Sequence, residues 1–452
     1  MRYFQLPVLG LIFFAVLCAC VEYKEQDKFA EPFYVLKGVH VIPIQPAGVL
    51  RDQTLLIRGQ RIVAMGPSHK MDIPENAVHL AVKNKFVMPG LSDMHVHLDG
   101  YRDLLIMLRH GVTRVRNLSE NSAVARAAGA PVMPELKQEV ERGEAPGPQL
   151  YNCGPILDGD PPQHALTRVI KTREDAFKAV KYTHDKGFDC VKVYNHLSSE
   201  RYADILEASQ KYRLPVLGHV PYAVNWEQAI DTMKSIEHLS GYVDSHRAVY
   251  RVPPETWAAA LSETAQSGVF HCPTLALWDM HPAYDELDKV KKSPRYKYVP
   301  PMTKLLWEVA VESFYDMEYA SKSTYRARML GLTQPLTLAL HQAGSPLLIG
   351  TDTNMTGVFP GVATLREMNL FVEAGISNQD VLRIATWNAA RYFGDTGLYG
   401  SVAPGKMADL LILDKNPLVN MQHIETMAGV FVQGKWWSRA NLDQKIADSL
   451  SS

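Results

Sequence analysis

The chain has 452 residues, of which 46% are hydrophobic and 21% are charged, and its formal net charge is −1. This length and composition are ordinary for a globular protein with a sizeable core. The near-zero net charge gives no broad electrostatic basis for binding nucleic acid or an anionic membrane surface, so we expect no nucleic-acid partner.

The first twenty residues differ from the rest of the chain. Arg2 precedes an apolar run from Leu6 to Leu17, and Cys18-Ala19-Cys20 follows it. A basic start and a short apolar run before small residues are typical of a secretory signal, and Pro7 makes an anchor helix the weaker interpretation. We therefore predict a signal peptide over residues 1–20 and an exported, periplasmic protein. The ending resembles a bacterial lipobox, so the expected membrane contact is a lipid anchor at Cys20.

Five cysteines are present, and Cys18 and Cys20 belong to this leader. The other three, Cys153, Cys190 and Cys272, are widely spaced and form no CxxC pair. An exported protein could oxidise two of them, but the spacing demands no disulfide. Free, buried thiols are the favoured interpretation.

Short alternating segments stand at both ends of the mature chain. They are rich in β-branched residues and bounded by Gly and Pro, as short strands are. These segments cover 34–42, 54–64, 408–414 and 429–435. We expect residues 33–86 and 400–437 to form one small β-sandwich domain, and residues 438–452 to be a C-terminal tail.

Between these ends the pattern changes to strand, loop and helix, repeated. Thr172-Arg173-Glu174-Asp175 and Asn225-Trp226-Glu227-Gln228 carry the capping signals of helix starts. Eight strands alternating with helices predict a parallel (β/α)₈ TIM barrel over residues 87–399. Residues 274–330 exceed a normal crossover, so we interpret them as a helical insertion over the barrel mouth. The strands are expected at 93–97, 112–116, 149–153, 189–194, 215–219, 235–238, 269–273 and 347–352.

The first barrel strand carries a histidine pair, in Asp93-Met94-His95-Val96-His97. Strand side chains alternate, so His95 and His97 share one face. Two imidazoles at the end of a barrel strand are suited to binding one cation, and packing or surface histidines are the plain alternative. The position at the start of the barrel series favours the metal.

Lys192 lies in the strand Cys190-Val191-Lys192-Val193-Tyr194 and shares the inward face with Cys190 and Tyr194. A lysine directed into a barrel has to be paired, neutral or modified, because an isolated buried ammonium is costly. Carboxylation by CO₂ would produce a carbamate able to bridge two metals. Pairing with a carboxylate, or reaching solvent at the strand end, is the alternative.

Three more strand ends carry candidate ligands. His219 and His238 each close a short apolar strand, and Asp352 ends the last one. Each alone has a plain explanation, as a satisfied polar histidine or a helix cap. Together with the first strand and Lys192 they favour a two-metal site, with zinc first and manganese, iron or cobalt possible. Glu237 is expected on the face opposite His238, in a structural role.

At these motifs the chain resembles the amidohydrolase superfamily, in its imidazolonepropionase-like branch of carboxylated-lysine, two-metal hydrolases. The resemblance implies His95, His97 and Asp352 on one metal, His219 and His238 on the other, and carboxylated Lys192 as the bridge. It also implies that a hydroxide shared by the metals attacks a carbonyl carbon, while Asp352 takes its proton and returns it to the leaving nitrogen. The matching motifs are 89–97, 111–116, 191–193, His219, 236–238, 350–352 and 403–410.

Two departures from the family pattern bear on the substrate. Tyr222 stands where family deaminases commonly have a glutamate, so amide hydrolysis is favoured over ring deamination. The loop 154–160, with only His164 nearby, lacks the glycine- and histidine-rich segment of some family peptidases, which weakens a dipeptidase assignment. The candidates for substrate contacts are Tyr194, Asn195, His196 and His164.

The leading hypothesis is hydrolysis of a C–N bond in a small amide, such as an N-acyl amino acid, a dipeptide or a cyclic amide. Alternatives on the same site are a lactone or other ester hydrolase and a ring deaminase. An exported binding protein with a vestigial site is the alternative from another class, although the intact set of six ligands speaks against it. The expected partner is a small-molecule substrate, and a homo-oligomer stays open.

Overall fold

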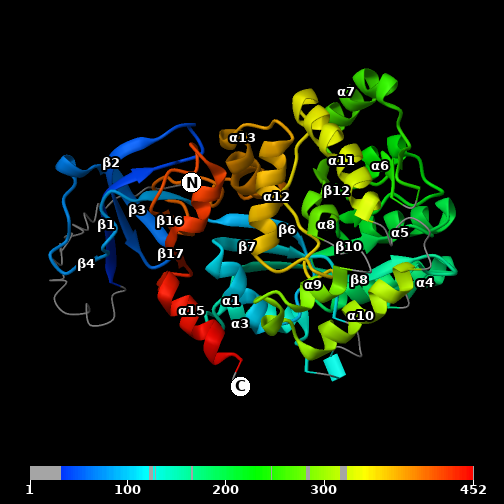
Figure 1. Ribbon diagram of the computed structural model, residues 1–452, viewed down its shortest axis with the longest axis horizontal. Helices are drawn as coiled ribbons and strands as arrows, with labels where there is room; N and C mark the ends of the chain where they lie inside the picture. Colours follow the sequence, from blue (N-terminus) through cyan, green and yellow to red (C-terminus); the bar gives the residue numbers. More distant parts are fainter. Residues whose placement is uncertain are drawn as a thin grey trace, which may run out of the picture.

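The computed structural model describes residues 32–121, 126–127, 129–163, 166–245, 247–280, 286–315 and 323–450 (Figure 1). The predicted signal peptide, the anchor at Cys20 and the candidate His164 lie outside the described residues. Within these ranges, no helix combines the length and apolar character needed to cross a bilayer.

Both ends of the chain contribute strands to one mixed sheet, seen in Figure 1 as blue and red strands beside the barrel. The junction is β5, which pairs in parallel with β1 and antiparallel with β16, so that Phe86 faces Leu413 and Pro89 faces Leu410. The predicted joining of the two ends into one small β domain is thereby confirmed. The strands of this end sheet are β1 (Phe33–Val41), β2 (Leu50–Arg58), β3 (Arg61–Pro67), β4 (Val78–His79), β5 (Phe86–Pro89), β16 (Leu410–Leu413), β17 (Met427–Val432) and β18 (Lys435–Ser438).

The second large sheet is parallel and runs in the order β15-β12-β11-β10-β8-β7-β6, with β9 beside β8. Residues 346–353 nearly close it, because Leu348 N donates to His271 O (2.8 Å) and Met94 N donates to Ile349 O (2.8 Å). The eighth predicted strand is therefore present as backbone bridges, and the barrel prediction is confirmed. The strands are β6 (Leu91–Val96), β7 (Val112–Asn117), β8 (Gln149–Asp158), β9 (Arg168–Val169), β10 (Cys190–Val193), β11 (Val216–Gly218), β12 (Ser235–Glu237) and β15 (Phe270–Cys272). A separate hairpin pairs β13 (Val243–Asp244) with β14 (Val249–Tyr250).

Helices surround the barrel, and their starts follow the sequence signals. Thr172 forms a full capping box with Asp175, and Asn225 accepts a hydrogen bond from the Gln228 N–H. Residues predicted as a C-terminal tail contain a helix instead, whose Ile446 packs with Leu105 and other side chains of the first helix. The helices are α1 (Tyr101–Arg109), α3 (Met133–Glu141), α4 (Arg173–Asp185), α5 (Ser199–Tyr212), α6 (Trp226–Thr232), α7 (Trp257–Ser267), α8 (Leu275–Met280), α9 (Leu287–Lys291), α10 (Pro301–Tyr315), α11 (Ser323–Ala343), α12 (Val362–Glu373), α13 (Asn378–Arg383), α14 (Ala389–Phe393) and α15 (Arg439–Asp448).

The helix α10 belongs to the long segment between β15 and the closing residues. Thr303 Oγ1 donates to Asp99 Oδ2 at 2.7 Å, and Trp307 Nε1 donates to Asn354 O at 2.8 Å. Asp99 follows β6 and Asn354 follows the closing segment, so α10 lies against loops at the carboxyl ends of the barrel strands. Active sites of such barrels lie at this end.

The barrel interior contains a disulfide between Cys153 and Cys190, with their Cα atoms 4.4 Å apart. The two residues face each other on the neighbouring parallel strands β8 and β10. The interpretation that these cysteines are free thiols is therefore wrong, whereas Cys272 is free and buried as expected. A spacing of 37 residues gave no sign of the pairing, because it depends on which strands become neighbours.

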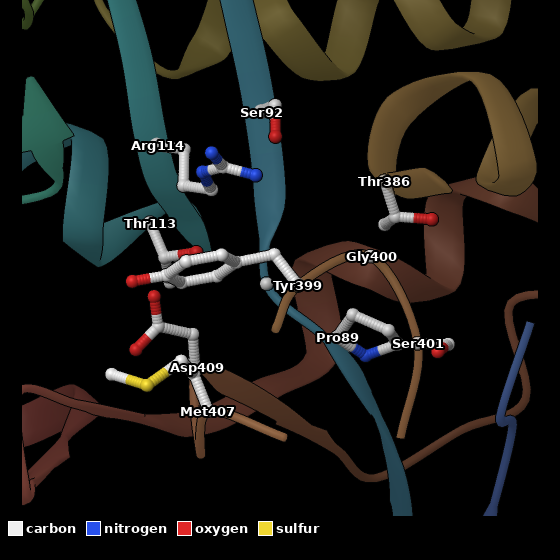
Figure 2. Close-up of a pocket in the computed structure, with 11 residues that line it drawn as sticks. Pro89, Ser92, Thr113, Arg114, Thr386, Tyr399, Gly400, Ser401, Met407 and Asp409 are labelled. Carbon is white, nitrogen blue, oxygen red and sulfur yellow. The ribbon is translucent and has the colours of Figure 1, made fainter. Parts of the chain in front are cut away.

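A small polar cavity lies between the amino ends of the barrel strands and the end sheet (Figure 2). Arg114 projects into it and forms an ion pair with Asp395, with Nη2 and Oδ2 2.6 Å apart. Asp409 borders the same cavity, and burial raises its pKa from 3.8 to about 7, although Arg114 opposes the rise. The folded protein therefore holds a proton on Asp409 that the unfolded chain releases at lower pH.

We predict that Asp409→Asn stabilises the protein more at about pH 8 than at about pH 5. Because the folded-state pKa is raised, the stability contributed by protonated Asp409 is complete below about pH 4 and is lost as the pH rises through about 7. Thermal unfolding of both proteins at the two pH values measures the difference. An equal shift of the melting temperature at both values would contradict the assignment.

We also predict that a peptide map prepared without reductant contains a cross-linked pair of peptides carrying Cys153 and Cys190. Cys272 in the same sample should react with an alkylating reagent only after denaturation, because it is buried. Mass spectrometry before and after reduction is the measurement. Recovery of Cys153 and Cys190 as separately alkylated thiols from the unreduced sample would refute the disulfide.

Candidate metal centre

The six candidate ligands converge at the carboxyl ends of the barrel strands. The closing segment brings Asp352 to His95 of β6 and to His97 just after it, with Oδ1 3.1 Å from His95 Nε2 and 3.0 Å from His97 Nε2. From β10, Lys192 Nζ donates to His95 Nε2 at 3.2 Å. These four side chains therefore form one contact network from three parts of the barrel.

The remaining two histidines complete the cluster. His238 Nε2 lies 3.8 Å from Asp352 Oδ2, and the His238 ring centroid is 4.6 Å from that of His95. The His219 ring is next in line, with its centroid 4.8 Å from that of His238. The structure thus brings together all six side chains that the sequence singled out.

All four imidazoles have Nδ1 bonded to an oxygen outside the cluster, and the Nε2 atoms of His95, His97 and His238 lie 3.0–3.8 Å from an oxygen of Asp352. The partners set the tautomer of three of them: a carboxylate accepts from His95, the Asn195 amide oxygen accepts from His219, and the Thr274 hydroxyl donates to Pro273 O at 2.7 Å and so accepts from His238. The four contacts are His95 Nδ1–Glu237 Oε2 (2.8 Å), His97 Nδ1–Ser119 Oγ (2.7 Å), His219 Nδ1–Asn195 Oδ1 (3.0 Å) and His238 Nδ1–Thr274 Oγ1 (2.7 Å).

This arrangement fits a divalent metal ion. With Nδ1 of His95 donating to Glu237, a neutral His95 turns its Nε2 lone pair toward Asp352 Oδ1, a repulsive contact that a cation between the atoms makes favourable. Ligand atoms of His95, His238 and Asp352 all lie within 4.8 Å of one another. Imidazole nitrogens held by outward hydrogen bonds, together with a carboxylate, are the donor set that zinc and similar metals take.

The protonation states also suit metal ligands. Burial lowers the pKa of His97 and of His219, and it lowers that of His238 to about 3, so these imidazoles are neutral at neutral pH. Burial likewise lowers the pKa of Lys192, against the attraction of Asp352. Burial alone would raise the pKa of Asp352, but His95 and His238 lower it well below its ordinary value. Asp352 is therefore a carboxylate beside an amine that loses its proton easily.

Three residues of the centre have left-handed backbone conformations that L-residues seldom adopt. The φ angles are 59° at His238, 52° at Thr274 and 61° at Asp352. Such conformations cost on the order of 1–3 kcal/mol each and persist where the surrounding structure enforces them. Their concentration here is typical of a functional site.

The turn at His238 corrects the prediction for Glu237. Regular alternation would place the two residues on opposite faces, but the left-handed φ at His238 ends the alternation. Glu237 is fully buried and reaches His95 from inside the barrel. Its other oxygen, Oε1, accepts from Arg116 Nη2 at 2.7 Å. The sequence signal that could have predicted this ion pair is one charged residue of each sign, Arg116 and Glu237, within otherwise apolar strands.

The candidates for substrate contacts lie along one side of the cluster. The Tyr194 ring is 4.0 Å, centroid to centroid, from the ring of His219. Asn195 orients His219, and its Nδ2 donates to Gln163 Oε1 at 2.5 Å. His196 is farther out, where its Nδ1 bonds Pro161 O at 2.8 Å. Asn195 therefore contacts the candidate ligand His219 through Nδ1, the ring nitrogen that points away from the cluster.

Comparison with known proteins agrees with this fold. A bottromycin amidohydrolase structure is 25% identical, with a TM-score of 0.73, over 93% of this chain and 90% of that one. A prolidase in complex with N-methylphosphonate-L-proline is 22% identical, with a TM-score of 0.65, over 90% of this chain and 100% of that one, and shows the same fold.

Among curated proteins, an adenine deaminase from Staphylothermus marinus is 24% identical over 200 residues, which are 41% of this chain. The chain spans about a third of the length of that relative, 32%. The model of the amidohydrolase family matches residues 86–437, a range that includes every barrel strand and all six candidate ligands. That match extends over most of the sequence and confirms the resemblance drawn from the motifs: the chain belongs to the amidohydrolase family.

Proposed function

We propose that this protein hydrolyses a C–N bond of a small amide, such as an N-acyl amino acid, a dipeptide or a cyclic amide. The observation that carries the proposal is the convergence of four imidazoles on Asp352 and Lys192 in one buried cluster. Family membership supports it, and so do the functions for which similar proteins are named, an amidohydrolase, a prolidase and a deaminase.

The proposed cofactors are two divalent metal ions, zinc first. His95, His97 and Asp352 would hold one, His219 and His238 the other, and a carboxylated Lys192 would bridge them. Ions bound there would acidify water and polarise a substrate carbonyl. Carboxylation requires a neutral amine, and the buried position of Lys192, which lowers its pKa, favours that form.

In this proposal Asp352 moves the proton. Its pKa lies well below the ordinary value, so the carboxylate is free to accept a proton from the attacking water. Oδ1 contacts His95 and His97, while Oδ2 faces His238, so the group lies at the middle of the cluster. The same carboxyl would then donate the proton to the leaving nitrogen. Asn195 acts by holding His219 in its tautomer.

Ring deamination is the second candidate, favoured by the similarity to the adenine deaminase. We rank deamination below amide hydrolysis because Tyr222 stands where family deaminases commonly have a glutamate. The products separate the two: amide hydrolysis releases a new carboxylate, whereas deamination releases ammonia without one. Ester or lactone hydrolysis on the same site is separated by comparing matched amide and ester substrates.

We predict about two metal ions per chain in the purified protein and a clear loss in Lys192→Ala, because the bridging ligand is removed. Elemental analysis is the measurement. Lys178→Ala is the matched control, since the Lys178 side chain is 70% exposed on α4. One metal in both the parent and Lys192→Ala would rule out the bridge. No metal in the parent, even after reconstitution, would remove the basis of the proposed function.

We predict that Asp352→Asn lowers turnover of the best amide by about 10²–10⁴-fold, the usual contribution of a general acid–base. The amide keeps an oxygen ligand but cannot carry the proton, so much of the metal should remain. Steady-state rates and metal content are measured together on the same preparation. Asp414→Asn is the control, because Asp414 is exposed on the end sheet and pairs with Lys85. Near-normal turnover in Asp352→Asn would refute the proton-transfer role.

A further inference from the structure

We propose that Glu237 is a positioning residue that makes the two metal positions unequal. By accepting the Nδ1 proton of His95, it makes this histidine the strongest donor of the four. The position that includes His95 then binds its ion more tightly than the position formed by His219 and His238. The inference rests on the proposed function, whose metal ligands it ranks.

The partners of the four Nδ1 atoms differ in charge. His95 donates to a carboxylate, Glu237 Oε2, at 2.8 Å, and both side chains are 0% exposed. The other three histidines meet neutral oxygens, the hydroxyls of Ser119 and Thr274 and the side-chain amide of Asn195. Hydrogen bonds to an ionised acceptor are roughly twice as strong as neutral ones. A carboxylate behind a histidine also raises the basicity of its other nitrogen toward a metal.

Glu237 is held as a carboxylate by Arg116. Arg116 Nη2 is 2.7 Å from Glu237 Oε1, and Ser235 Oγ donates to the same oxygen at 2.6 Å. One oxygen of Glu237 is thus occupied by the cation and the hydroxyl, which leaves Oε2 for the imidazole.

Arg116 is itself fixed to the strand that carries His95. Its Nε donates to Met94 O at 2.6 Å, its Nη1 donates to Ser235 Oγ at 2.8 Å, and the guanidinium lies 4.7 Å from the centroid of the Tyr392 ring. The side chain is 1% exposed. Glu237 therefore has little freedom to move away from His95, and the hydrogen bond is preorganised before any metal binds.

Titration of the purified protein with zinc against a chelator tests the proposal, because it measures the two affinities without any substrate. Wild type is expected to bind two ions in separate steps. Glu237→Gln should lower the zinc affinity of the tighter step by about 10–100-fold, the usual effect of losing such a hydrogen-bond partner. The affinity of the weaker step should stay within a few-fold of the wild-type value. Asn195→Ala should do the reverse, because Asn195 supports His219.

Two variants keep the test independent of folding. Glu237→Asp retains the charge that balances Arg116, and its shorter side chain should weaken the tighter step alone. Asp409→Asn is the matched control and should leave both zinc-binding steps unchanged. Asp409 lines the cavity at the amino ends of the barrel strands (Figure 2), whereas the metal centre lies at their carboxyl ends. In metal-free protein, the His95 Nδ1–H should give a strongly downfield nitrogen-coupled proton resonance, lost in Glu237→Gln and kept in Asp409→Asn.

The inference would be overturned if the two zinc-binding steps of wild type had equal affinities, or if the tighter step were unchanged in Glu237→Gln and Glu237→Asp. Binding of two metals would in that case still support the proposed function. Unequal steps that respond as described, in a protein that turns over no amide, would support the inference and count against the proposed reaction. Absence of zinc binding by wild type would overturn both.

Discussion

The structure depends on holding four imidazoles, an amine and a carboxylate together in one buried place. Each histidine bonds an oxygen outside the cluster through Nδ1, which leaves Nε2 for the cluster. Without those four partners the rings could flip or take up protons, and like charges would accumulate in a region that burial makes costly. The outward hydrogen bonds therefore define the centre as much as the ligands do.

The acceptors come from elements that pack for other reasons. Thr274 begins the turn into α8, and Glu367 of α12 fixes that turn by accepting from Ala276 N at 2.5 Å. Asn195 follows β10, and Glu237 ends β12. The left-handed conformations at His238, Thr274 and Asp352 allow side chains of neighbouring residues to reach one point. The barrel supplies the stability that maintains these strained turns.

The polar groups at the two ends of the barrel differ in whether they are paired within the chain. At the carboxyl ends, imidazole nitrogens, an amine and a carboxylate converge in a donor set that fits a divalent cation. At the amino ends, Arg114 is already paired with Asp395 and stacks over Tyr399, 4.2 Å from its ring centroid. The charges there are satisfied within the chain, as expected for the end of a barrel that serves stability.

The sequence by itself determined the strands of the barrel and of both chain ends, and the six side chains of the centre. Each leaves a local mark, a period of two in a strand or a polar residue where a strand ends, because these features depend on near neighbours in the chain. Only the tertiary structure decided the Cys153–Cys190 disulfide, the closure by residues 346–353 and the partners of the four Nδ1 atoms. Those depend on which strands become neighbours and on where the backbone leaves its regular conformation. Glu237 shows the reason most directly: it shares the inward face of β12 with Ser235, and the left-handed residue after it, His238, departs from the alternation on which the prediction was based.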